Sequence, residues 1–123
     1  PKHKKIFMES GKLFYGGKIL ENYSDQLFEL LGDTGVRAIY CDGVNKPLFI
    51  DYLGYPHIET KIVFNSRKRL NALIKRFARK NSIRFEKNKP IVLEKLEDGS
   101  IFQGNLGDDF IDPMFIIKKG KDL

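Results

Sequence analysis

The chain has 123 residues, of which 41% are hydrophobic and 31% are charged, as expected for one globular domain with its own core. Its formal net charge of +6 suits an acidic partner, whether nucleic acid, a phosphate, an anionic membrane or an acidic protein. The single cysteine, Cys41, excludes an internal disulfide, and with two histidines it cannot supply the ligands of a structural zinc site. No apolar run approaches the roughly 20 residues that span a bilayer, and no N-terminal stretch has the pattern of a signal peptide.

The first third of the chain predicts a hairpin and a short helix. Two apolar runs within residues 4–15 flank a Ser-Gly-Lys turn, which is the pattern of a small hairpin. In "YSDQLFELLGD", residues 23–33, three leucines fall at helical spacing. Ser24 or Asp25 can cap this helix, and Gly32 ends it.

Three strands are predicted next, over residues 36–41, 47–53 and 57–64, because these runs are rich in β-branched and aromatic side chains. Cys41, at the end of the first run, is predicted to be a small buried hydrophobe and not a reactive thiol. The bend "CDGVNKP" between the first two runs could grip a ligand. A turn alone explains its Gly, Asn and Pro, and no residue of the bend requires a ligand, so we interpret it as a structural hairpin.

A basic amphipathic helix is predicted from Asn65 or Ser66 to about Asn81, with an apolar stripe at i, i+3, i+4 and i+7. It carries no acid, and its basic residues are Arg67, Lys68, Arg69, Lys75, Arg76, Arg79 and Lys80. A solvated face and an anionic partner both account for this charge. We therefore name one candidate partner-binding face, formed by Lys68, Lys75, Arg76 and Arg79.

Strands return in the last third, over residues 90–96, 100–106 and 114–118. An Asp-Gly pair at residues 98–99 is a strong hairpin signal between the first two. Runs of strands separated by single helices predict an α+β fold, with a mainly antiparallel sheet and the helices packed on one face.

Catalytic and metal-binding chemistry is weakly signalled. The chain contains no G-x-x-x-x-G-K-[ST], so no P-loop is present to hold a phosphate. His3 and His57 are interpreted as surface imidazoles, without a nearby Cys or Ser in sequence to form a nucleophile–base pair. Asp108, Asp109 and Asp112 offer oxygen ligands to Ca²⁺ or Mg²⁺, but their spacing matches no EF-hand and we interpret them as a loop. We predict no catalytic and no metal-binding residue in this chain.

Four segments together carry a family resemblance. They are "LLGDTGVRAIYCDGVNKPLFIDY", "IETKIVFNSRKRLNALIKRFARKN", "NKPIVLEKLEDGSIFQGNLG" and "MFIIKKG". In this order, over roughly residues 24 to 120, they resemble the N-terminal domain of type II/IV secretion-system ATPases, and the archaeal branch of that family most. These are the hexameric motors of secretion, pilus assembly and conjugation. The hairpin built on Leu-Glu-Asp-Gly-Ser is the most specific of the four segments.

The resemblance implies that residues 1–123 are one non-catalytic domain of a larger ATPase. ATP and Mg²⁺ would then be bound by an adjoining RecA-like ATPase domain outside this chain. The domain would change its angle to that motor during the ATP cycle and so couple ATP hydrolysis to protein secretion or pilus assembly. Implied partners are neighbouring subunits of the hexamer and membrane or secretion-platform proteins, and the implied location is cytoplasmic, at the inner face of the membrane.

The chain departs from the family pattern at its arginines. The arginine that follows Asp-Gly-Ser in the family is Ile101 here, and the arginine of the closing strand is Lys118, which keeps the charge but loses bidentate geometry. An arginine just before that strand has no counterpart. Lys118 and its neighbour Lys119 are the residues for which the resemblance implies proximity to a nucleotide.

Two other functions remain open from the residues alone. The basic helix suits a stand-alone nucleic-acid-binding domain, although no aromatic residues interleave with its basic ones to stack on bases. A small ligand-sensing module is the other, and it would require a pocket between the sheet and the helix.

Overall fold

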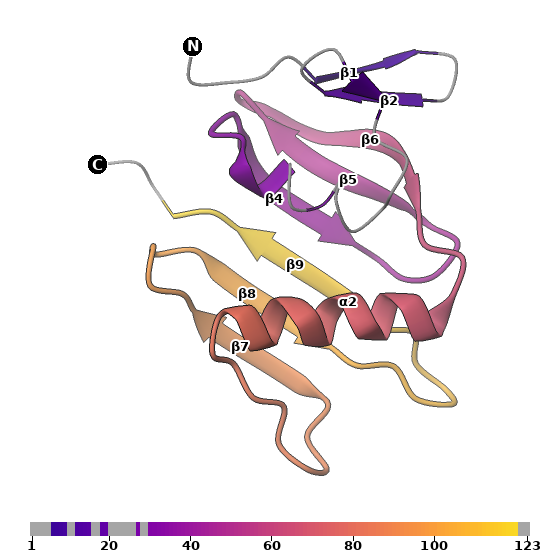
Figure 1. Ribbon diagram of the computed structural model, residues 1–123, viewed down its shortest axis with the longest axis vertical. Helices are drawn as coiled ribbons and strands as arrows, with labels where there is room; N and C mark the ends of the chain where they lie inside the picture. The colour runs from indigo at the N-terminus through magenta and orange to yellow at the C-terminus, as the bar shows by residue number, and fades with distance from the viewer. Residues whose placement is uncertain (1–5, 10–11, 16–17, 20–26, 28–29, 121–123) are drawn as a thin grey trace.

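The computed structural model describes residues 6–9, 12–15, 18–19, 27 and 30–120, and at residue 61 and the described residues before residue 20 only the backbone is described. Its main body is one six-stranded antiparallel sheet in the order β6-β5-β4-β9-β8-β7, with the helix α2 lying across one face (Figure 1). A separate sheet, in the order β1-β2-β3, lies beside β6 at one edge. The α+β class with a mainly antiparallel sheet is confirmed.

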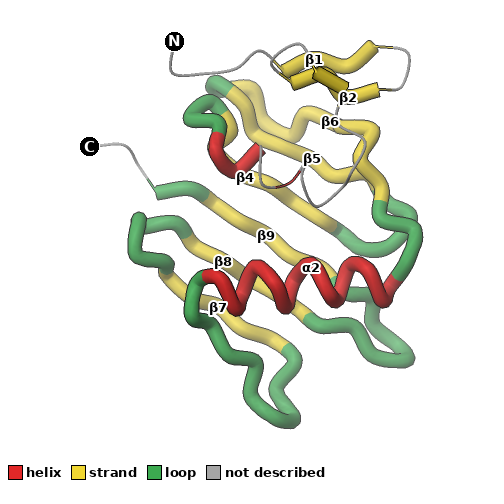
Figure 2. Tube along the Cα trace, viewed as in Figure 1, coloured by secondary structure: helices red, strands yellow, loops and turns green. Residues whose placement is uncertain are grey.

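Along the chain, groups of strands are separated by single helices, in the order that the sequence predicts (Figure 2). The small sheet contains β1 (Ile6–Glu9), β2 (Lys12–Tyr15) and β3 (Lys18–Ile19), and β3 was not predicted. The main body comprises β4 (Val36–Cys41), β5 (Pro47–Tyr52), β6 (Tyr55–Val63), α2 (Arg67–Lys80), β7 (Ile91–Lys95), β8 (Ile101–Asn105) and β9 (Met114–Lys118). Residues 27 and 30–32 are helical, as predicted, whereas the predicted caps Ser24 and Asp25 lie outside the described residues.

The core lies between α2 and the sheet. The apolar stripe of α2 is buried, with Leu70 at 0% and Ile74 at 1% exposure. It packs on side chains that alternate inward from the strands, and the rings of Phe77 and Phe102 lie 4.9 Å apart between their centres. Leu27, from the short helix, joins the same cluster on the same face. The second face of the sheet is therefore left without a helix among the described residues.

Turn chemistry explains where the strands end. The hairpin of β4 and β5 turns through Gly43 and Asn45, which both have positive φ, and this confirms the interpretation of "CDGVNKP" as a structural turn. The strand β6 begins two residues earlier than predicted, because Leu53 (φ 49°) and Gly54 (φ 85°) form a tight turn with two left-handed residues. A leucine in that conformation gives little sequence signal.

Candidate partner-binding surfaces

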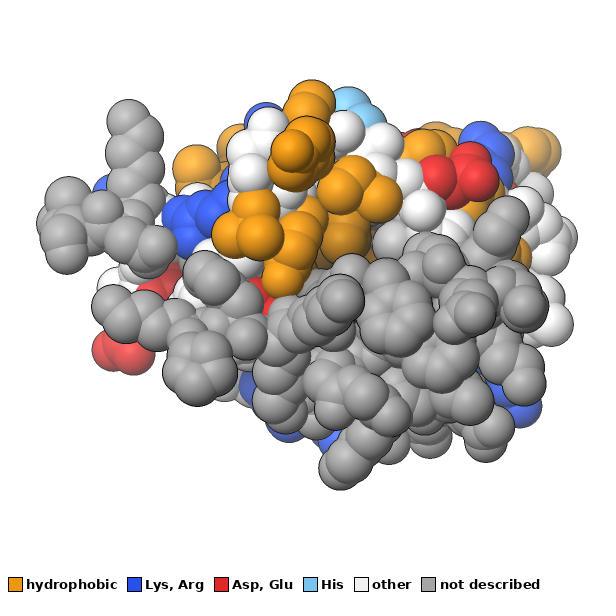
Figure 3. Space-filling view, turned by 90° about the horizontal axis from the view of Figure 1, so that it is seen from above, with side chains coloured by type: hydrophobic (Ala, Val, Ile, Leu, Met, Phe, Trp, Pro, Cys, Tyr) orange, Lys and Arg blue, Asp and Glu red, His pale blue; other side chains and the backbone are white. Residues whose placement is uncertain are grey.

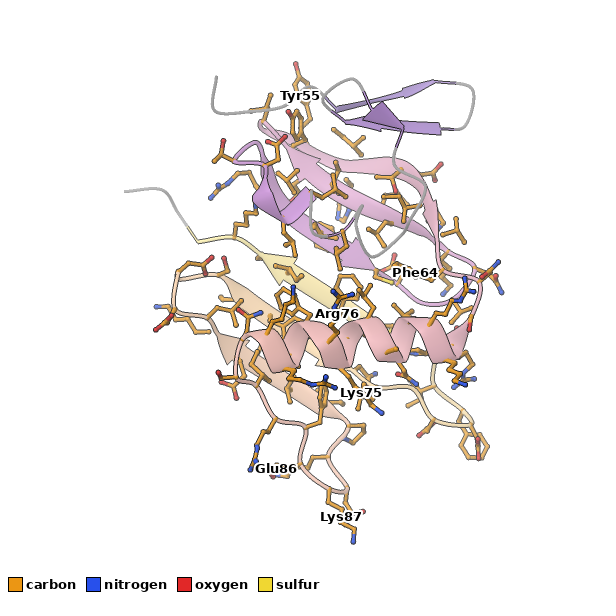
Figure 4. All side chains as sticks on the ribbon, in the orientation of Figure 1. Tyr55, Phe64, Lys75, Arg76, Glu86 and Lys87 are labelled. Atoms are coloured by element: carbon orange, nitrogen blue, oxygen red, sulfur yellow. The ribbon has the colours of Figure 1, made fainter. Side chains whose placement is uncertain are left out.

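The solvent-facing side of α2 carries the predicted basic face. Lys68, Lys75 and Arg79 fall on one stripe, at i, i+7 and i+11, and all three side chains are exposed. Because a helix rises about 1.5 Å per residue, this stripe is roughly 16 Å long. Arg76 is also exposed, and in Figure 4 it and Lys75 leave the helix on opposite flanks. All four predicted residues are thus exposed on the solvent side of α2, three along one stripe and Arg76 on the other flank, and we call these four residues the basic face.

The basic side chains in the first turn of α2 destabilise that turn. That turn contains no acidic residue, and both Lys68 and Arg69 lie there exposed. The helix dipole places partial positive charge at this end, so cations there are unfavourable. The last turn, with Arg79 and Lys80, has the favourable sign. The stability of the helix therefore does not explain the basic residues of its first turn.

Positive charge continues beyond the helix. Residues 66–89 contain ten basic side chains and one acidic one, so their net charge of +9 exceeds the +6 of the whole chain. The rest of the protein is therefore net negative. Glu86, the acidic residue, lies 3.7 Å from the ammonium of Lys89 across an exposed surface. A charge distribution this uneven favours an oriented approach of an anionic partner to the α2 side.

Arg67 belongs to a loop contact and not to the basic face. Its guanidinium lies 3.6 Å from a carboxylate oxygen of Asp112 and donates a 2.8 Å hydrogen bond to the carbonyl of Ile111. Asp108 accepts from the backbone N–H groups of Phe110 and Ile111, which lowers the pKa of its carboxyl group. The acidic cluster thus stabilises its own loop. Among the residues that the structure describes, no three His, Cys, Asp or Glu side chains gather to hold a metal ion.

The structure separates the two lysines at the end of β9. Lys118 is exposed on the sheet face that α2 does not cover, because the neighbouring Ile117 is buried on the α2 side. The ammonium of Lys119 donates a 2.6 Å hydrogen bond to the carbonyl of Asp33. Neither lies on the basic face of α2, so the two predicted sites are on different surfaces.

The Asp-Gly-Ser turn between β7 and β8 has a role beyond the turn itself. Asp98 accepts from the backbone N–H of Ser100 at 2.8 Å, and this bond, together with the charge of Lys119, lowers the pKa of its carboxyl group. The hydroxyl of Ser100, which is buried, accepts from the N–H of Gly120 at 3.3 Å, and Arg37 donates to the carbonyl of Gly120. The turn and Arg37 therefore fix the backbone that leaves β9. We call these two contacts to Gly120 the clamp. The sequence motif indicated the hairpin but not the clamp.

An aromatic cluster covers part of the open sheet face, and sequence reasoning missed it. The ring of His57 lies 4.5 Å from that of Tyr40 and 6.0 Å from that of Phe49, between centres. Asp51 accepts from the Tyr40 hydroxyl at 2.9 Å and from the His57 backbone N–H at 2.8 Å. Partial burial, followed by Asp51, raises the pKa of Tyr40. The imidazole is exposed, as predicted, whereas His3 lies outside the described residues.

Side chains fill the space between α2 and the sheet where a ligand-sensing module would need its pocket. The apolar residues that line this space leave no room for a water molecule; they are Leu27, Leu73, Ile74, Phe77, Phe102, Phe115 and Ile117. Cys41 is 1% exposed in this core, and its burial raises the pKa of the thiol to about 11. Its prediction as a buried hydrophobe is confirmed.

Fold and surfaces together define an α+β module with a basic helix on one face of an antiparallel sheet and an uncovered face behind it. No family model matches the chain. It is 30% identical over 111 residues to a Methanocaldococcus jannaschii protein named "Uncharacterized protein MJ1288", across 90% of this chain and 41% of that protein. The chain therefore spans less than half the length of this relative.

The fold is similar to that of a secretion ATPase. The crystal structure of the VirB11 ATPase from the Brucella suis type IV secretion system, in complex with sulphate, matches 82% of this chain and 31% of its own, with a TM-score of 0.56. Sequence identity over the match is 13%, so the likeness shows a shared fold. No helix among the described residues is long and apolar enough to cross a membrane.

Proposed function

We propose that this chain is the N-terminal assembly and regulatory domain of a secretion-type ATPase. The observation that carries the proposal is the shared fold with part of the VirB11 ATPase over 82% of this chain. It is supported independently by the four sequence segments that resemble the same family. The relative from an archaeon, of which the match covers 41%, fits a domain within a longer protein of the archaeal branch.

The two predicted surfaces have different roles in this proposal. The basic face of α2 meets an acidic surface of a neighbouring subunit in a hexamer or of a membrane or secretion-platform protein. We infer a location in the cytoplasm at the inner face of the membrane, where such partners would lie. The domain contributes no catalytic group. It couples ATP hydrolysis in the motor domain to protein secretion or pilus assembly by changing its position relative to that domain.

Of the two lysines at the end of β9, one is placed to contact a nucleotide. Lys118 is exposed and offers a point charge to a phosphate that approaches the open sheet face. Lys119 does not fit this role while its ammonium is bonded to the Asp33 carbonyl. ATP with Mg²⁺ would supply the phosphoryl-transfer chemistry in the motor domain, and of the two lysines only Lys118 would contribute a contact.

ATP hydrolysis by the product of the whole gene tests the proposal. We expect hydrolysis in that product, none in residues 1–123 alone, and a rate that changes several-fold when Lys68, Lys75 and Arg79 are replaced by Glu. The control is Lys46→Glu, an exposed lysine in the β4–β5 turn, which should leave the rate unchanged. An inactive whole-gene product, or a rate indifferent to the triple reversal, would speak against it.

The charge of residues 66–89 favours a second candidate function, binding of nucleic acid through the basic face. Phosphate contacts release counterions, so such binding weakens steeply as salt is raised. Fluorescence anisotropy with a labelled DNA duplex and a labelled RNA strand at low salt would detect it. If the second candidate is right, the salt dependence becomes shallower in the Lys68, Lys75, Arg76 and Arg79 to Ala variant. Unchanged anisotropy at low salt with both probes would eliminate it.

A further inference from the structure

The strand β7 is an edge of the main sheet, and one side of its backbone is left without a neighbouring strand. The N–H of Leu96, just after β7, donates to the carbonyl of Ser100, the residue opposite it. In an antiparallel pair, positions that bond to the partner strand alternate with positions that do not. Counting back from Leu96, the backbone groups that point away from β8 belong to Ile91, Leu93 and Lys95.

No described residue covers this edge. The outward N–H and C=O groups have no hydrogen-bond partner within the described part of the chain. The side chains of Leu93 and Ile91 are 67% and 57% exposed on the open sheet face, where Lys95 and Gln103 interleave with them. The feature to be explained is therefore the row of unpaired backbone groups, which is a ready site for pairing with another strand.

The opposite edge of the sheet, β6, differs from this one. The small sheet lies beside it, with β2 in contact with β6 (Figure 1). Figure 3 views that end and shows hydrophobic side chains gathered there. The pairing of β6 with β5 also shifts register at two places, whereas β7 pairs with β8 without a shift. A regular edge can continue a ladder of hydrogen bonds, so β7 is the edge suited to accept a strand.

Charge beside the free edge indicates the chemistry of a partner. The loop that leads from α2 into β7 carries the exposed side chains of Arg84, Lys87 and Lys89. It packs on the α2 side of the sheet, where its Phe85 joins the core, and in Figure 4 Lys75 leaves α2 on the flank where this loop lies. A second copy of the chain would bring the same positive charge to this edge, whereas acidic side chains would be attracted.

We propose that the free edge of β7 binds an extended segment of a partner protein, which adds to the sheet as a further antiparallel strand. Apolar side chains of this segment lie opposite Ile91 and Leu93 on the open face, as cross-strand pairs. The residues between them point to the α2 side. They are acidic in the C-terminal half of the segment, because an antiparallel strand places that half beside the Ile91 end of β7 and its basic loop.

Backbone bonds supply the affinity in this mode of binding, and the alternation of side chains supplies the specificity. The inference goes beyond the proposed function and does not depend on it. Loss of the strand site would leave a secretion-type ATPase domain possible, and a whole-gene product without ATPase activity would leave the strand site intact.

Binding of a synthetic peptide to residues 1–123 tests the proposal. The probe is the labelled peptide Val-Thr-Val-Thr-Val-Glu-Val-Glu, and fluorescence anisotropy follows its binding. If its valines lie on the open face, their N–H groups donate to β7. Methylation of the amide nitrogens of the two inner valines should then weaken binding at least about tenfold, because two hydrogen bonds are lost.

The matched control is methylation of the threonine and the glutamate that follow those two valines. Their N–H groups point away from β7 in the proposed register, so binding should stay within about twofold of the parent peptide. An equal loss for both methylated peptides, or no loss for either, would overturn the proposal. No anisotropy change with the parent peptide would overturn it as well.

Replacing both glutamates of the probe by lysine tests the acidic half of the segment. At low salt we expect binding at least about fivefold weaker, since the basic loop then repels the peptide. The difference should shrink as salt is raised. Equal affinity for the two peptides at low salt would contradict the acidic partner.

Leu93→Pro tests the same edge from the protein side. It removes an outward N–H and leaves the bonds between β7 and β8 in place, and proline is accepted on edge strands in that position. We expect at least about tenfold weaker binding, and a smaller loss from Leu93→Ala, which keeps the N–H. Tyr55→Ala, at a residue 69% exposed on the other edge strand, should bind as the wild type does. Wild-type binding by Leu93→Pro would refute the site.

Amide hydrogen exchange reads the edge in the wild-type protein, without any substitution. In residues 1–123 alone, the amides of Ile91, Leu93 and Lys95 should exchange fast, whereas those of Val92 and Glu94 should be protected. The peptide should slow the first three at least about tenfold. Unchanged exchange at saturating peptide would place the binding elsewhere and overturn the proposal. Protection that rises with protein concentration in the absence of peptide would also overturn it, because a second copy would then occupy the edge.

Discussion

Cys41 shows how strongly one side chain is constrained by its place in the core. The thiol lies among apolar side chains of the sheet, and burial is the largest cause of its raised pKa, about 11 instead of 9.0. Its thiolate is therefore almost absent in the folded protein at neutral pH. The residue contributes packing and offers no nucleophile to the surface.

Stability should depend on the protonation of Cys41 in alkaline solution. Below about pH 9 the thiol is protonated in both states, whereas between about pH 9 and pH 11 only the unfolded chain loses the proton. The free energy of unfolding should therefore fall as pH rises through this window. Urea unfolding at several pH values measures the slope, and Cys41→Ala should show a shallower one. Identical slopes would contradict the buried, protonated thiol.

Gly104 is a second residue whose identity the core fixes. It shares the inner face of β8 with Phe102, and a β-carbon at Gly104 would lie 2.5 Å from Cζ and 2.8 Å from Cε2 of that ring. Phe102 is 1% exposed and has little freedom to move. A glycine in the middle of a strand is thus explained by close packing.

Gly104→Ala should lower the free energy of unfolding by about 1–3 kcal/mol, because overpacking forces the ring and backbone to shift. The same substitution at Gly32 serves as the control. Beyond the helix's own backbone and the adjacent residues, no atom of the described residues lies within 4 Å of a β-carbon there, so we expect a neutral or slightly stabilising effect. Thermal or urea unfolding measures both variants. Equal effects at the two positions would show that the Phe102 contact is absent in solution.

At the scale of the element, α2 follows most directly from the sequence. Ser66 has extended backbone angles, φ −138° and ψ 123°, and its hydroxyl accepts from the N–H of Arg69 at 3.3 Å. The helix ends at Lys80 with Asn81 as its C-cap, as the sequence predicts. Propensity, cap and apolar stripe all agree here, and such agreement is what makes an element predictable.

Ser66→Ala should lower the free energy of unfolding by about 1 kcal/mol, because the first turn then loses the acceptor for one of its N–H groups. Lys75→Ala, an exposed mid-helix change, should stay within about 0.5 kcal/mol of the wild type. Urea unfolding followed by circular dichroism compares the two. A larger loss from Lys75→Ala than from Ser66→Ala would refute the assignment of Ser66 as the cap.

Prediction from sequence was less complete where distant segments meet. The bounds of β4 and β9 agree with the predicted runs, because β-branched and aromatic residues fill them. The pairing of β4 with β9, which places them at the centre of the sheet, leaves no local signal. The same is true of the clamp at Gly120 and of the ring contact between His57 and Tyr40. Each depends on strand register, which only the folded sheet establishes.

Of the candidate surfaces, those that depend on strand pairing could not be predicted from sequence either. The basic face follows from helical spacing alone, so Lys68, Lys75 and Arg79 were assigned from sequence. The exposure of Ile91 and Leu93 could not be, because β7 reads like any buried strand until its place at the sheet edge is known. Lys118 and Lys119 are adjacent in sequence, yet one is exposed on the open face and the other is bonded to Asp33. Their different environments required the structure.

At the scale of the whole molecule, two unlike surfaces lie on opposite sides of one sheet. The α2 side carries the excess of positive charge, whereas the other side of the sheet exposes Ile91, Leu93, Ile101 and Met114 among polar side chains of the same three strands. Charge favours fast, salt-dependent encounter, whereas apolar area favours lasting contact. In the proposed function, the basic face of α2 meets an acidic surface of a partner by the first kind of contact.

The most direct test of this account is the reading frame of the source gene past Leu123. If the proposed function is right, the frame continues and encodes a G-x-x-x-x-G-K-[ST] loop within roughly the next two hundred residues, the size of one further domain. A frame that stops at Leu123, or that continues without such a loop, would contradict the proposed function.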